Sequence, residues 1–192
     1  MDYIGLIELA REYSWNVFDA NPTMKPFHIF HTGLFIAHAD QLLLRQGHEL
    51  NAEVVRLSAI MHDIGRPTED LGLIKKIGRL CVHHIEGARM AKEFLDSQGF
   101  PYSQSVASAI LGHGGKTDRI TPEERAIYDC QRVSDSNPAL YCWFKANNSP
   151  LEEISTFFKG EFEACKKVPP HYDFSKAVIA EHLRIMEPII IG

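Results

Sequence analysis

Apolar residues recur at intervals of three and four along nearly the whole chain, and this spacing constrains the fold more than any other feature of the sequence. Such spacing is typical of helices that bury one face. The alternation of apolar and polar residues that marks a half-buried strand is absent, and so are internal repeats. Glycines and prolines divide the pattern into roughly seven to nine segments. The sequence therefore predicts an all-α helical bundle.

The expected helices are bounded by turn residues and by residues that favour helix ends. In chain order they cover residues 2–19, Phe27 to about Leu44, Asn51 to Asp63, about His83 to Asp96, Ser103 to His113, Thr121 to Asp135, a segment that begins at Pro150, and Ser175 to Met186. The polar connection from Arg66 to Gly78 leaves room for one more short helix at Leu71 to Ile77.

Length and composition point to one soluble domain. The chain has 192 residues, of which 45% are hydrophobic and 23% are charged, as in ordinary globular proteins. Its formal net charge of -5 argues against binding to a nucleic-acid backbone. No segment approaches the ~20 apolar residues that a membrane span needs. The four cysteines are far apart and read as reduced thiols, so we expect a cytoplasmic protein.

A histidine and an aspartate stand side by side at the end of one apolar helix. The run Ala59-Ile60-Met61-His62-Asp63-Ile64-Gly65 leads into Arg66-Pro67, and Asn51 can cap its start. Gly65 and Pro67 end the helix, so His62 and Asp63 fall on its last turn. Burying an ionised carboxylate there is costly unless it meets a cation. We therefore consider Asp63 a candidate metal ligand, although a histidine at a helix end can also simply interact with the helix dipole.

Other histidines and one more aspartate occupy comparable places on other helices. The candidate set comprises His31, His62, Asp63, His83, His113 and Asp135. Helices of a bundle can build metal sites from inward-facing imidazoles and carboxylates. Because the set offers nitrogen and oxygen but no thiolate, it favours iron, manganese, magnesium, cobalt or nickel over a structural zinc site.

The order of these residues resembles the H…HD…D signature of the HD-domain superfamily, whose members are mostly metal-dependent phosphohydrolases with an all-α fold. Ala59 to Gly65 is similar to the family's apolar-apolar-His-Asp-Ile-Gly segment. His83-His84-Ile85-Glu86-Gly87-Ala88 looks like the family's second histidine element, in which a histidine precedes Gly-Ala by four residues. That register selects His83, with His84 as its rival. Ile110 to His113 resembles a third element.

One element departs from the family pattern. The last aspartate of the family commonly lies in an Asp-Ala-Asp-Arg-Leu-like run, and aligning Asp129 to Val133 with it would put Gln131 at the ligand position. The alternative register, Val133-Ser134-Asp135, keeps an aspartate. We prefer Asp135, and a glutamine at the ligand position would weaken metal binding.

The resemblance implies a single HD domain over residues 1–192. Its metal-site core would cover about 27–145, and helices within 150–190 would pack on that core. One or two divalent ions would be bound, with Asp63 bridging the two ions of a binuclear site. In such a site His83 and His113 would complete the second metal's set.

The resemblance also implies a reaction, hydrolysis of a phosphomonoester, nucleotide or phosphodiester. Asp63 and His62 would carry the chemistry. Arg66 and Lys116 are candidates for binding the substrate phosphate. Two alternatives share the same ligand types: a di-iron oxygenase of the HD type and a non-catalytic module that binds a metabolite.

Overall fold

The structure, a computed structural model, describes residues 3–66, 83–114 and 118–191. This part of the chain contains nine helices and no strand, which confirms the all-α prediction. They are α1 (Tyr3–Phe18), α2 (Lys25–Gln46), α3 (Ala52–Met61), α5 (His83–Ser97), α6 (Ser103–His113), α7 (Pro122–Ser136), α8 (Pro138–Ala146), α9 (Leu151–Lys167) and α10 (Asp173–Ile191). The short helix expected at Leu71 to Ile77 lies outside the described residues.

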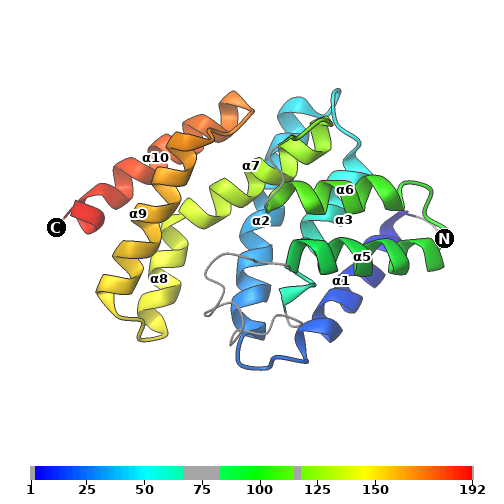
Figure 1. Cartoon of the computed structure of the whole chain (residues 1–192), viewed down its shortest axis with the longest axis horizontal. Coiled ribbons are helices and arrows are strands. Elements are labelled where there is room, and N and C mark those ends of the chain that lie inside the picture. Colours follow the sequence, from blue (N-terminus) through cyan, green and yellow to red (C-terminus); the bar gives the residue numbers. More distant parts are fainter. Residues whose placement is uncertain (1–2, 67–82, 115–117, 192) are drawn as a thin grey trace.

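The helices pack around two hydrophobic clusters. The larger cluster is built by α1, α2, α3, α5, α6 and the first part of α7, and it buries long side chains such as Phe35, Leu57 and Ile110 completely. The smaller cluster lies where α8, α9 and α10 meet the end of α7, around Leu140 and Phe158. Figure 1 shows these three helices together on one side, with α7 running from them to the rest of the molecule.

Capping residues begin two of the helices that carry the candidate residues. The side chain of Asn51 accepts hydrogen bonds from the backbone amides of Glu53 and Val54, as expected for the start of α3. At the start of α7, Thr121 and Glu124 form a reciprocal capping box. These local signals were readable in the sequence because each rests on side chains two or three residues from the cap.

The segment after α7 differs from the expected helix boundaries. The chain turns at Asn137 and starts α8 at Pro138, whereas the sequence analysis predicted no separate helix before Pro150. Asn137 caps the new helix by accepting a hydrogen bond from the amide of Ala139. An asparagine before a proline is a recognisable helix start, so the signal was present.

Among the described residues, no helix is both long and apolar enough to cross a membrane.

Candidate metal centre

Asp63 lies at the centre of a buried group of histidines. Helix α3 ends at Met61 with His62 as its C-cap, so Asp63 falls in the turn just beyond the helix. Because the last five residues of α3 are all buried, the turn is drawn into the core with them. Only 1% of Asp63 is exposed, and His62 is fully buried.

Two groups of possible metal ligands share Asp63. The first is His31, His62 and Asp63, and the second is Asp63, His83 and His113. Within each group, the nitrogen and oxygen atoms lie within 4.8 Å of one another, and all five residues are buried. The structure thus brings together five of the six residues that the sequence analysis proposed as ligands, from α2, α5, α6 and the turn after α3.

Each oxygen of the Asp63 carboxylate faces one group. Oδ2 lies 3.5 Å from His31 Nδ1 and 3.5 Å from His62 Nε2. Oδ1 lies 3.5 Å from His83 Nε2 and 3.9 Å from His113 Nε2. The Nε2 atoms of His83 and His113 are 3.1 Å apart. A carboxylate in this position can bridge two cations, one for each group.

Backbone carbonyl groups fix the orientation of two imidazoles. His62 Nδ1 donates to the carbonyl oxygen of Ala59, and His113 Nδ1 donates to that of Ile110. A carbonyl only accepts hydrogen bonds, so the ring proton of each histidine sits on Nδ1. In the neutral ring, Nε2 then presents a lone pair to the Asp63 carboxylate. Metal-binding histidines in proteins are held in this way by a hydrogen bond from the other ring nitrogen.

Several atoms of the two ligand groups form no hydrogen bond, although the guanidinium of Arg66 lies 2.9 Å from Asp63 Oδ1. His31 Nδ1, His62 Nε2 and both oxygens of Asp63 are buried and form no hydrogen bond within the described part of the chain. These donor atoms converge at about 3.5 Å without hydrogen-bonding one another, and a cation between them would be coordinated by all of them. The nitrogen and oxygen donors of both groups therefore fit a divalent metal ion.

Electrostatics holds Asp63 ionised despite its burial. Burial alone would raise the pKa of Asp63, but the charge of Arg66 and the neighbouring rings of His62 and His31 hold it well below its usual range. Burial lowers the pKa of His31, yet the carboxylates of Asp135 and Asp63 outweigh it and raise the pKa to about 9. For His113, burial above all, with a smaller contribution from the neighbouring His62, holds the pKa well below its usual range, so this ring is neutral.

Close backbone packing brings α5 next to Asp63. A Cβ atom at Gly65 would overlap the carbonyl oxygen of His83 and lie 2.6 Å from the amide nitrogen of Gly87. Only a glycine lets the turn after Asp63 approach the first turn of α5 so closely. This contact places His83 beside Asp63. His84 belongs to neither ligand group, and its ring meets those of His83 and His113 edge-on.

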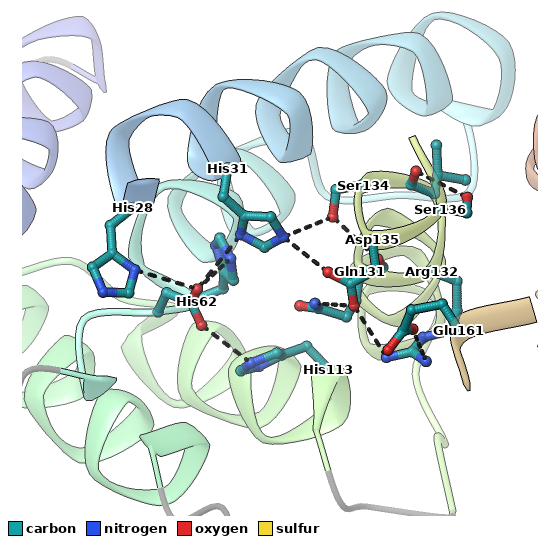
Figure 2. A network of polar contacts seen from close by, with 12 residues as sticks. His28, His31, His62, His113, Gln131, Arg132, Ser134, Asp135, Ser136 and Glu161 are labelled. Atoms are coloured by element: carbon teal, nitrogen blue, oxygen red, sulfur yellow. Dashed lines mark hydrogen bonds and ion pairs between the residues drawn. The ribbon is translucent and has the colours of Figure 1, made fainter. Parts of the chain in front are cut away.

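Asp135 lies beside His31, on the opposite nitrogen from Asp63. Its Oδ1 atom is 3.1 Å from His31 Nε2, so two carboxylates flank one imidazole. Figure 2 shows His31 between His62 and Asp135. Asp135 is not a member of either compact group. In the alternative register, Asp129 is engaged elsewhere by the amides of His171 and Tyr172, and Gln131 donates to Asp135 Oδ2 at 2.6 Å.

Of the two residues proposed to bind phosphate, the structure describes Arg66 but not Lys116. Arg66 Nε lies 2.9 Å from Asp63 Oδ1, and 30% of the Arg66 side chain is exposed. The guanidinium is thus at the edge of the centre. Lys116 lies outside the described residues.

His28, which the sequence analysis left out of the ligand set, also lies in the site. It lies one turn before His31 on α2, is 3% exposed, and places Nδ1 3.9 Å from Asp63 Oδ2. Burial lowers its pKa to about 4, so the ring is neutral. The spacing of three residues from His31 was a usable signal because it puts both rings on one helix face.

Comparison with known protein families identifies one family that matches the chain. A model of the HD domain matches residues 28–135, which is more than half of the chain. The match begins at His28 and ends at Asp135, and it therefore includes every residue of the two ligand groups. No curated protein and no solved structure matches the chain.

Proposed function

The chain belongs to the HD-domain family, and from that premise we propose that it is a metal-dependent phosphohydrolase acting on a small phosphorylated substrate. One observation carries the proposal: the buried Asp63 carboxylate turns one oxygen to His31 and His62 and the other to His83 and His113. A carboxylate shared by two ligand groups can hold two ions near each other, as two-metal hydrolytic sites require.

We propose that His31, His62 and Asp63 hold one divalent ion, that Asp135 fixes the His31 ring from its other nitrogen, and that Asp63, His83 and His113 hold a second ion. When bound, such ions supply Lewis-acid activation of a water molecule and of a phosphoryl oxygen. The chain's own contribution is to fix the ligands. His62 and His113 are oriented by the carbonyl groups of Ala59 and Ile110, so little reorganisation is needed at reaction.

Binding and orienting the substrate falls to cationic residues at the edge of the centre. Arg66 is close to Asp63 and partly exposed, so its guanidinium can meet a phosphate that approaches the ions. Lys116 is retained as a second proposed phosphate contact. The buried surroundings of Asp63 exclude bulk water from the reacting groups, which strengthens electrostatic interactions there.

Hydrolysis assays with defined metals test this proposal. The protein is stripped of metal, supplied with Mn²⁺ or Co²⁺, and offered phosphomonoesters, nucleotides and phosphodiesters. We expect phosphate release or ester cleavage that requires metal and disappears in Asp63→Ala, while His48→Gln at an exposed site keeps the wild-type rate. Two bound irons with oxygen consumption and no hydrolysis would instead indicate an oxygenase. Metabolite binding without metal would indicate a non-catalytic module.

A further inference from the structure

Three side chains engage the carboxylate of Asp135. His31 Nε2 lies 3.1 Å from Oδ1, Gln131 Nε2 donates to Oδ2 at 2.6 Å, and Arg132 Nη2 lies 3.4 Å from Oδ2. Gln131 and Arg132 belong to α7 like Asp135 itself. Such contacts along one helix are individually weak restraints, because long side chains three or four residues apart have several rotamers of similar energy.

A residue of α9 restrains this arrangement from outside. Arg132 Nη1 donates to Glu161 Oε2 at 2.9 Å, and the side chains of Arg132 and Glu161 are only 16% and 21% exposed. The guanidinium is therefore held between a carboxylate of α9 and one of α7. Figure 2 shows the sequence of contacts from Glu161 through Arg132 and Asp135 to His31.

Because these side chains are largely buried, loss of one of them is expected to affect the others. A partly buried ion pair is screened less by water than a surface pair, and removing one partner leaves the other charge unbalanced. Without Glu161, Arg132 would lose its partner on α9 and turn towards solvent. Asp135 would then keep only Gln131 and His31 as partners, and its carboxylate would gain rotational freedom beside the proposed metal centre.

We propose that Arg132 and Glu161 are positioning residues that hold the Asp135 carboxylate against His31 for metal binding. The inference rests on the proposed metal centre. It adds a residue of α9 to those that position the proposed ligands. Helix α9 lies beyond residues 28–135, which the family model matches. The geometry assigns Glu161 a role that acts through Arg132 and Asp135 and not through contact with the substrate.

Mn²⁺ affinity, measured by calorimetric titration of the metal-free protein, tests the inference. We expect Glu161→Gln to weaken Mn²⁺ binding about tenfold and Arg132→Met by up to about 100-fold, the range found for partners of metal ligands. Glu163→Gln is the matched control, because Glu163 is on the same helix but pairs with Lys166 at the surface. It should bind Mn²⁺ like the wild type.

Combining the two changes separates positioning from general stability. If Glu161 acts through Arg132, Glu161→Gln should have no further effect on Mn²⁺ affinity in the Arg132→Met protein. A lower melting temperature with unchanged Mn²⁺ affinity in both single variants would overturn the inference, as would fully additive losses of affinity. A wild type that binds no Mn²⁺ would instead refute the metal centre itself.

Discussion

At the scale of single residues, the order of histidines and aspartates along the chain identified the candidate ligands. The contacts that each side chain makes could not be predicted from that order. Five ligands could be proposed from sequence, and the structure brings them close together: His31, His62, Asp63, His83 and His113. The choice of Asp135 on α7 was only a preference at the level of sequence, because all three candidate side chains lie within two helical turns. Their different partners follow from contacts of α7 with α2, with the segment that precedes α10, and within α7 itself.

The second ligand group gives the first prediction. Replacing His83 or His113 by Ala removes one nitrogen that faces Asp63 Oδ1, while His31 and His62 on the Oδ2 side stay intact. We expect each variant to bind one metal ion where the wild type binds two, as measured by elemental analysis after reconstitution. Retention of two ions by both variants would show that these histidines serve another purpose, such as contact with the substrate.

A histidine remote from the centre gives a prediction about pH. His38 is buried, its Nε2 lies 3.1 Å from Ser175 Oγ, and its ring stacks on Phe174. Burial, helped by the charge of His182, lowers its pKa from 6.5 to about 4. The unfolded chain therefore takes up a proton between pH 6.5 and 4 that the folded chain does not, so His38 makes stability fall as the pH falls through this window.

Urea unfolding at pH 7 and at pH 5 measures this effect. A shift of this size corresponds to a few kcal/mol at most, on the order of 1.4 kcal/mol per pKa unit. We expect His38→Gln to lose less stability than the wild type between the two pH values. His48→Gln, at an exposed position, should behave like the wild type. An identical loss in all three proteins would contradict the assignment to His38.

At the scale of helices, the residues that begin and end helices could be recognised in the sequence. The contacts between helices could not, because they depend on packing. Asn51 and Thr121 begin α3 and α7 as expected. The contact between α5 and the turn after α3 was not predictable, because it depends on two backbones meeting at Gly65 and Gly87, far apart in sequence. That contact determines where His83 lies.

Gly65→Ala tests this contact. The added Cβ would overlap backbone atoms of α5, so the helix and His83 must move, at a cost of about 1–3 kcal/mol in folding free energy. We expect a lower melting temperature and the loss of the second metal ion. Gly160→Ala is the control, because nothing lies within 4 Å of its Cβ position on α9. Unchanged metal content in Gly65→Ala would mean that His83 does not depend on this approach.

At the scale of the whole molecule, the proposed centre ties several helices together through Asp63. Its ligands come from α2, the turn after α3, α5 and α6, and Asp135 and Glu161 connect it to α7 and α9. The sequence predicted a family that covers the centre, but the role of α9 depends on a contact between residues that no local pattern relates.

Metal binding should therefore stabilise the whole fold. An ion present at about 100 times its dissociation constant adds about 2.7 kcal/mol to the free energy of unfolding. For a chain of this length, that raises the melting temperature by roughly 5–10 °C. We expect Mn²⁺ to produce such a rise in thermal unfolding and a chelator to reverse it. The same rise in Asp63→Ala would contradict binding at this centre.

The central claim is that one carboxylate holds two metal ions, and metal counting on the wild type and Asp63→Ala tests it most directly. Both proteins are reconstituted with saturating Mn²⁺, freed of excess ion, and analysed for metal and protein. Because both oxygens of Asp63 face ligand groups, we predict two ions per chain in the wild type and none in Asp63→Ala. A wild type that never exceeds one ion, or an Asp63→Ala protein that keeps its full metal content, would contradict the account.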